Sequence, residues 1–225
     1  MAFTDTKSKG ITKARASAIE WLARTGVTEG FGCSGSNAAC EYKPNNSVTR
    51  GAMAQYFQRL AGWTDAQVAA VYANKSNSFT DISGLTAERR LAIMWLADTG
   101  ITKGCDPDGS QYCPSKVVNR GAMAEFMQKF AGVKPVETKT SVFPDVSAQS
   151  VKVQYDDSKT ASQVPAQPLN RIAAINWLSS NKITQGFGTN SAGKTVFRPS
   201  APVTRGAMAE FMQRLASKMT PKTSG

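Results

Sequence analysis

Three arginines occupy the same place in a heptapeptide that occurs three times in this 225-residue chain. The copies read VTRGAMA, VNRGAMA and VTRGAMA, with their arginines at Arg50, Arg120 and Arg205. The residue before each arginine is a helix-capping Thr or Asn, so a helix is predicted to start at each arginine. A cation in the first turn is disfavoured by the helix dipole. The pattern therefore indicates an anion site, where helix amides and a guanidinium converge on one acceptor.

A glycine follows each arginine, at Gly51, Gly121 and Gly206. Glycine is mildly unfavourable within a helix, and here it would let a ligand approach the backbone closely. The alternative is structural. In that case each arginine pairs with a carboxylate of the neighbouring repeat, and the aspartates of the Phe-x-Asp segments described below are the obvious candidates.

A tryptophan recurs in the helical segment before each heptapeptide, at Trp21, Trp95 and Trp177. The apolar stripe of the first such segment runs through Ile19 and Leu22, so the tryptophan is expected beside the stripe. There it could stack on a sugar face, and packing between repeats is the equally open alternative. A second arginine precedes each tryptophan by six residues, and its plainest role is an exposed helix face; the three are Arg15, Arg89 and Arg171.

The composition excludes several kinds of chemistry. The chain has no histidine, which removes Ser-His-Asp and Cys-His catalysis and the usual zinc sites, and we expect no metal and no cofactor. The formal charge of +11 favours nucleic acid, an anionic wall polymer or a membrane surface as partner; a basic surface without a partner is the alternative. No apolar run is long enough to span a bilayer. The first residues do not form a signal peptide, so a secreted protein would have lost its signal.

Four cysteines form two close pairs, Cys33 with Cys40 and Cys105 with Cys113. Each pair lies just upstream of a heptapeptide, and we place both pairs at the same position of their repeats. Two local disulfides are predicted, each stabilising the fold by about 2–3 kcal/mol. They imply an oxidising, extracytoplasmic location; four reduced thiols in a cytosolic protein are the alternative.

Each heptapeptide closes a unit made of an aromatic-x-Asp segment, a helix, a glycine-rich loop and a second helix. The chain divides into repeat 1 at residues 1–62, a connector with repeat 2 at 63–134, repeat 3 at 135–217 and the start of a linker at 218–225. The connector predicts a short amphipathic helix. Repeat 3 carries a polar insertion over about residues 147–168, in which the alternation from Ser150 to Tyr155 predicts a short strand.

One unit has too little core to fold alone. We therefore predict a single all-α domain in which the three second helices lie side by side in a pseudo-threefold arrangement. Their Met, Phe and Leu stripes would face inward as core and would not form a cofactor site.

The pattern resembles the S-layer homology (SLH) domain in a triple tandem, of a variant similar to that of high-GC Gram-positive bacteria. The resemblance rests on Phe79-Thr80-Asp81 and Phe143-Pro144-Asp145, the step from Gly100 to Gly104, the loop exits Tyr42-Lys43-Pro44 and Phe197-Arg198-Pro199, and Val-Thr-Arg. The family implies a three-pronged spindle around a three-helix bundle. It also implies non-covalent binding of an anionic, often pyruvylated, secondary cell-wall polymer in grooves between repeats.

Carried over by motif, the ligand-binding role falls on the heptapeptide arginines, on Asp5, Asp81 and Asp145, and on Gly30, Gly104 and Gly186. The chain departs from the family pattern at several places. Ala52, Ala122 and Ala207 stand where the family has glutamate, Asn119 replaces threonine, the tryptophan comes later in the first helix, and the cysteine-clipped loops are not general.

We therefore expect a non-catalytic extracellular module that binds an anionic cell-wall glycan and tethers an S-layer protein or another surface protein. S-layer self-assembly would use regions outside this chain. The alternatives are the anchoring part of a secreted wall hydrolase and an adhesin that binds a host surface protein. A nucleic-acid binder would fit the charge, but the paired cysteines oppose it.

Overall fold

The computed structural model describes residues 3–7, 10–33, 40–106, 108–152 and 168–219. Within these ranges the regular structure is helical, accompanied by isolated β-bridges, which confirms the all-α class. The elements are the 3-10 helix η1 (Thr4–Lys7) and the α-helices α1 (Lys13–Arg24), α2 (Arg50–Leu60), α3 (Asp65–Tyr72), α4 (Ala87–Asp98), α5 (Arg120–Phe130), α6 (Ala148–Lys152), α7 (Pro168–Ser180) and α8 (Arg205–Ala216).

The heptapeptides begin α2, α5 and α8 as predicted. The side chains of Thr49, Asn119 and Thr204 cap the three helices by accepting the amide of the third helical residue, at 3.4, 2.8 and 3.3 Å. A capping side chain satisfies a first-turn amide that has no partner within the helix. The exchange of threonine for asparagine in the second copy therefore preserves the helix start.

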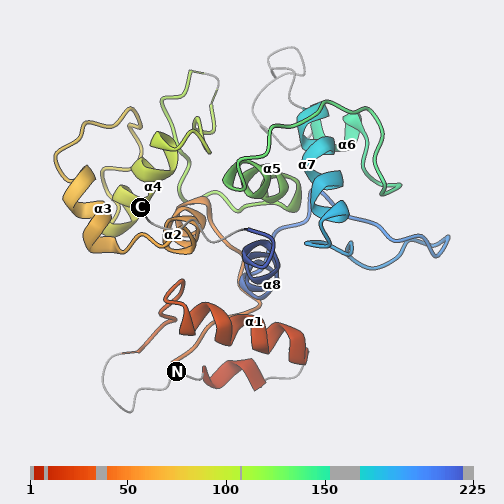
Figure 1. Cartoon of the computed structure of the whole chain (residues 1–225), viewed down its shortest axis with the longest axis horizontal. Coiled ribbons are helices and arrows are strands. Elements are labelled where there is room, and N and C mark those ends of the chain that lie inside the picture. The colour runs from red at the N-terminus through yellow and green to blue at the C-terminus, as the bar shows by residue number, and fades with distance from the viewer. Residues whose placement is uncertain (1–2, 8–9, 34–39, 107, 153–167, 220–225) are drawn as a thin grey trace.

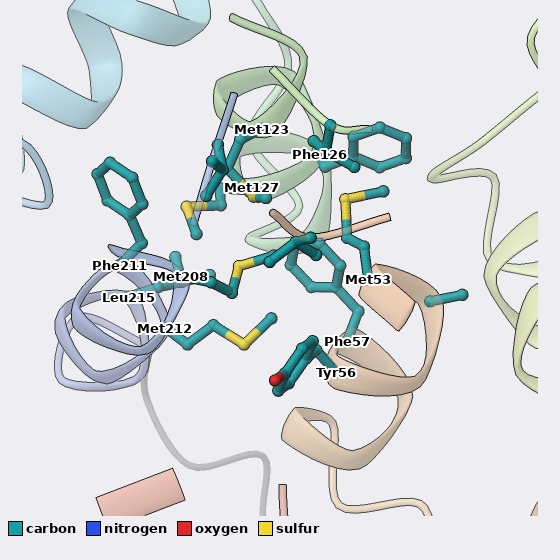
Figure 2. Close-up of a cluster of buried hydrophobic side chains, with 14 of the residues drawn as sticks. Met53, Tyr56, Phe57, Met123, Phe126, Met127, Met208, Phe211, Met212 and Leu215 are labelled. Atoms are coloured by element: carbon teal, nitrogen blue, oxygen red, sulfur yellow. The ribbon is translucent and has the colours of Figure 1, made fainter. Parts of the chain in front are cut away.

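These three helices lie at the centre of the molecule, and their apolar stripes face one another (Figure 1, Figure 2). Met53, Met123 and Met208 are fully buried, and Phe57 of α2 packs against Phe130 of α5 with ring centroids 4.9 Å apart. The inward-facing stripes are thus confirmed as core.

The first helix of each unit packs against the second helix of another unit. The contacting pairs are α2 with α4, α5 with α7, and α8 with α1. The heptapeptide valines close the same circuit: the amide of Val48 donates to Val203 O, that of Val203 to Val118 O, and that of Val118 to Val48 O, at 2.8, 2.9 and 2.9 Å. Each unit is therefore completed by its neighbour.

The connector contains α3, which packs on α4 and buries Val68 and Tyr72, as predicted. The strand expected from Ser150 is wrong where the structure describes it, because residues up to Lys152 belong to α6. Ser147 and Ser150 cap each other's amides at 3.1 and 2.8 Å, and Val151 is buried, which favours a helical turn packed on α7. The rest of the insertion, residues 153–167, and the last residues of the expected linker, 220–225, lie outside the described residues.

Candidate anion-binding junctions

Each heptapeptide arginine reaches the glycine-rich loop of the next unit in the circuit. We call these contacts the Arg50 junction, the Arg120 junction and the Arg205 junction. Arg50 donates from Nε to Tyr112 O at 2.8 Å and from Nη2 to Gly104 O at 3.2 Å. Arg120 repeats the pair with Phe197 O at 2.7 Å and Gly186 O at 3.3 Å, and Arg205 donates to Tyr42 O at 2.7 Å. The arginines thus fasten the loops with charge-assisted hydrogen bonds.

Each guanidinium also lies over aromatic rings. The Arg50 guanidinium lies 4.6 Å from the ring centroid of Tyr112 and 5.5 Å from that of Phe126. The equivalent rings are Phe197 and Phe211 around Arg120, at 4.6 and 5.3 Å, and Tyr42 and Tyr56 around Arg205, at 4.5 and 5.6 Å. Such contacts stabilise a cation that has lost water.

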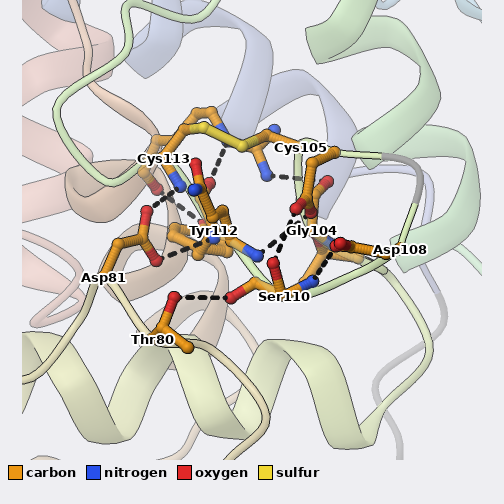
Figure 3. The surroundings of a disulfide bond; sticks show 12 residues. Thr80, Asp81, Gly104, Cys105, Asp108, Ser110, Tyr112 and Cys113 are labelled. Carbon is orange, nitrogen blue, oxygen red and sulfur yellow. Dashed lines mark hydrogen bonds between the residues drawn. A yellow bond between two sulfur atoms is a disulfide. The ribbon is translucent and has the colours of Figure 1, made fainter.

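The Phe-x-Asp aspartates bind the same loop residues from the amide side (Figure 3). Asp81 accepts from the amides of Tyr112 and Cys113 at 2.9 and 2.7 Å. Cys113 has φ +58°, a left-handed conformation that costs energy outside glycine and that the carboxylate stabilises. Asp5 and Asp145 make the same pairs of bonds, with Tyr42 and Lys43 and with Phe197 and Arg198.

The alternative in which the arginines pair with these aspartates is therefore wrong. Among the described residues, no carboxylate lies within ion-pair distance of a heptapeptide arginine. Instead, arginine and aspartate hold opposite sides of one peptide segment: Tyr112 offers its carbonyl to Arg50 and its amide to Asp81.

The recurring glycines Gly30, Gly104 and Gly186 also belong to the junctions. Gly104 has φ +100°, and a Cβ there would lie 3.2 Å from the ring of Phe79 and 2.5 Å from Gln111 O. Gly30 and Gly186 share the positive φ, at 78 and 91°. Only glycine brings the backbone this close to the Phe-x-Asp ring, and Gly104 and Gly186 also present their carbonyls to Arg50 and Arg120.

The predicted convergence of helix amides on an external anion is wrong. The amides of Arg50 and Gly51 donate to Lys116 O and Pro114 O, both at 2.9 Å, and α5 and α8 use the equivalent loop carbonyls. The glycine makes room for this contact rather than for a ligand. A Cβ at Gly51 would lie 3.2 Å from Pro114 O and 2.9 Å from Arg89 Cδ. What remains for an anion is the guanidinium.

The three guanidinium groups differ in burial. Arg120 is 3% exposed and Arg205 is 8% exposed, whereas Arg50 is only half-buried. Burial lowers the pKa of Arg120 to about 10, an effect that Asp145 opposes and Arg198 reinforces. Arg120 therefore stays charged at neutral pH.

The recurring tryptophans do not contact the heptapeptide arginines. Trp95 is 4% exposed, so the prediction that it offers its face to a sugar is wrong. Its helix, α4, is packed against both α2 and α3. Trp21 and Trp177 are half-buried and pack against the core. No hydrogen bond or ring contact of the described residues joins a tryptophan side chain to a heptapeptide arginine. The structure thus favours packing for this position.

The second recurring arginine does not simply lie on an exposed helix face, as expected, but contacts another unit's second helix. Arg15 of α1 pairs with Glu210 of α8 at 2.7 Å, and Arg171 of α7 pairs with Glu125 of α5 at 2.8 Å. Arg89 of α4 instead meets the neutral Gln55 of α2 at 3.3 Å. The signal was available in the sequence, since Gln55, Glu125 and Glu210 occupy one position of the three second helices.

Both disulfides form as predicted, Cys33–Cys40 and Cys105–Cys113. Their equivalence within the repeat is wrong. Thr80 bonds to Ser110 O as Thr4 bonds to Cys40 O, so Cys40 corresponds to Ser110 and not to Cys113. The structural counterparts of Cys113 are Lys43 and Arg198, which follow the same aromatic residue and donate to the same aspartate oxygen.

Two further features of the described residues concern other kinds of site. Within the described ranges, no cluster of three or more His, Cys, Asp or Glu side chains could hold a metal ion. None of the helices placed there is long and apolar enough to cross a membrane.

No curated protein matches the chain, but a family model does. The model of the S-layer homology domain matches residues 2–54 and 168–209. The first match includes Asp5 and Arg50, and the second includes Gly186 and Arg205, so both contain residues of the junctions. These two segments of the chain therefore match the S-layer homology domain, a non-catalytic type of module that anchors proteins to the cell wall.

Proposed function

We propose that this chain binds an anionic secondary polymer of a bacterial cell wall and thereby tethers an S-layer protein or another surface protein outside the cell. Binding is non-covalent, the chain performs no reaction on the polymer, and acidic groups of the polymer bind at one or more of the arginine junctions. Where a junction binds, its arginine contacts the polymer, and its Asp and Gly residues hold the loop around that arginine.

The observation that carries this proposal is the repetition of one cationic loop clamp at Arg50, Arg120 and Arg205. Each guanidinium donates a hydrogen bond from Nε to a loop carbonyl. Its fork has further N–H donors, and a guanidinium suits carboxylate or phosphate oxygens. The net charge of +11 adds a long-range attraction to a polyanion.

The proposal includes a third SLH repeat between the two matched segments. Residues 79–130 contain Asp81, Gly104 and Arg120 with the same contacts as their counterparts. On this basis we divide the chain as in the sequence analysis, at 1–62, 63–134 and 135–217, and we regard the three units as a pseudo-threefold spindle around α2, α5 and α8.

Retention on purified cell walls tests the function. The protein should sediment with walls that carry their secondary polymer and should stay in solution with walls from which the polymer has been extracted. Retention should fall as salt is raised, because screening weakens contacts between exposed charges. Equal retention on both wall preparations would contradict the proposal and would indicate peptidoglycan or protein as the receptor.

A further inference from the structure

Two junctions carry an aromatic lid. The ring of Phe187 lies under two guanidinium groups, that of Arg120 at 4.9 Å from its centroid and that of Arg198 at 5.1 Å. The ring of Phe31 likewise contacts two cations, Arg205 at 4.6 Å and Lys43 at 5.0 Å. These rings are 44% and 42% exposed, so each forms an outer surface of its junction. In both cases the chain's own ring occupies a guanidinium face that a ligand would need.

The Arg50 junction has a disulfide in place of this lid. Cys105 is the counterpart of Phe31 and Phe187, because it also follows the junction glycine and donates its amide across the loop, here to Gln111 O at 2.8 Å. Cys113 is the counterpart of Lys43 and Arg198. The Cys105–Cys113 disulfide therefore replaces both the ring and the outer cation (Figure 3). This substitution accounts for the greater exposure of Arg50.

The Arg50 junction is also more basic than the other two junctions at one position of its loop. The residue before the junction glycine is Lys103 here, Glu29 in the first unit and Gln185 in the third. Glu29 pairs with Arg59 at 3.1 Å. Lys103 is exposed and forms no ion pair with another described residue.

Two further cations near this junction lack a close acidic partner among the described residues. Arg89, whose side chain lies against Gly51, bonds to neutral Gln55, whereas Arg15 and Arg171 pair with glutamates. Lys129 donates to Ile101 O at 3.4 Å. Desolvation lowers the pKa of Lys129, Glu125 opposes this, and the charges of Lys103, Arg171 and Arg50 add to it. Glu125 is itself engaged with Arg171.

We propose that the three junctions are not equivalent and that the anionic polymer binds at the Arg50 junction, with Lys103 and Arg89 as additional binding residues. This inference rests on the proposed function and specifies its site. The ligand group is a carboxylate or phosphate of the glycan, small enough to lie against Arg50 beside the disulfide. The lids on Arg120 and Arg205 leave those arginines with a structural role.

Grafting the lid of the third unit onto the Arg50 junction tests the proposal. The double variant Cys105→Phe with Cys113→Arg should weaken binding to polymer-carrying walls at least about tenfold, because the new ring would cover Arg50. The variant gains one positive charge, so attraction by net charge alone would leave binding unchanged or tighter. The control Cys105→Ser with Cys113→Ser removes the disulfide without adding a lid and should retain binding. Unchanged or tighter binding of the folded lid variant would overturn the proposal.

A second pair of variants needs no change in the disulfide. Lys103→Gln and Gln185→Glu each lower the net charge by one at the same position of two different junctions. Lys103→Gln should weaken binding roughly fivefold, and Gln185→Glu should leave it within about twofold of wild type. Equal losses in both variants would mean that net charge governs binding, and the proposal would be wrong.

Binding to the polymer and the choice of the Arg50 junction can be disproved separately. If the wild-type protein binds walls with and without polymer equally, the proposed function is wrong, and the inference falls with it. If wild-type binding depends on the polymer but the matched variants behave alike, the function stands and only the choice of the Arg50 junction is overturned. Circular dichroism and thermal unfolding of each variant establish that the compared proteins are folded.

Discussion

At the scale of single residues, the recurring charged side chains mainly form hydrogen bonds with backbone groups of the loops. Arg50 binds the carbonyl of Tyr112, Asp81 binds its amide, and the Tyr112 hydroxyl returns a hydrogen bond to Arg50 O at 2.8 Å. A loop with little regular structure leaves peptide groups without partners, and buried peptide groups are costly when unpaired. The recurring arginines and aspartates meet that need in all three units.

The cost of losing a junction arginine should follow its burial. Arg120→Gln should lower the free energy of unfolding by about 2–3 kcal/mol, since it leaves Phe197 O and Gly186 O without the partner that a buried arginine supplies. Arg50→Gln should cost about 1 kcal/mol, because water can reach the freed carbonyls. Urea unfolding measures both values.

The control for this comparison is Arg198→Gln, which removes the second cation that contacts the ring of Phe187 and should cost about 0.5 kcal/mol or less. Equal losses for Arg120→Gln and Arg50→Gln would contradict the different burial of the two side chains.

At the scale of elements, the second helices start where another unit's loop meets them. The first two amides of α8 donate to Asn46 O and Pro44 O, both at 2.8 Å, and Thr204 caps the amide of Ala207. The helix N-terminus is thus filled by protein carbonyls, and the glycine of the heptapeptide allows their approach. This explains a residue that helix propensity alone disfavours.

Gly206→Ala should therefore destabilise the protein, although alanine normally favours a helix interior by roughly 0.5–1 kcal/mol. A Cβ at this position would lie 3.1 Å from Pro44 O and 2.6 Å from Arg15 Cδ. We expect a loss of at least about 1 kcal/mol in thermal or urea unfolding, typical of overpacking.

Gly84→Ala is the matched control, because a Cβ there would meet nothing within 4 Å and its φ is not positive. It should change stability by less than about 0.5 kcal/mol. A stabilised Gly206→Ala protein would show that the loop can withdraw from α8.

At the scale of the whole molecule, the units form a closed circuit. The contact of α1 with α8 joins the two ends of the described chain, and Arg15 and Glu210 add an ion pair across 195 residues of sequence. Because each first helix is buried by another unit's second helix, no single unit carries its own complete core.

The chain should therefore unfold in one cooperative transition. Calorimetry should give equal calorimetric and van't Hoff enthalpies, as expected of a two-state domain. Arg15→Ala, which weakens the closing contact, should shift the single transition to lower temperature without splitting it. Separate transitions for the three units would contradict the interdependence of their cores.

The sequence by itself was sufficient for the starts of α2, α5 and α8, for their inward-facing stripes and for the disulfide partners. These are encoded locally: Thr49, Asn119 and Thr204 are capping residues, the Met and Phe stripes have helical spacing, and Cys105 and Cys113 are close in the chain. The family resemblance also came from motifs that can be read without a structure.

Only the tertiary structure decided what each repeated residue does. The partners of Arg50 lie more than fifty residues away in another unit, so no local pattern distinguishes a guanidinium that binds a carbonyl from one that binds an aspartate or a ligand. The burial of Trp95 and the substitution of the Phe–cation lid by Cys105–Cys113 likewise arise from contacts between units. The heptapeptide therefore specifies where helices begin, whereas the packing of neighbouring units decides which of its arginines are buried and which stays partly exposed.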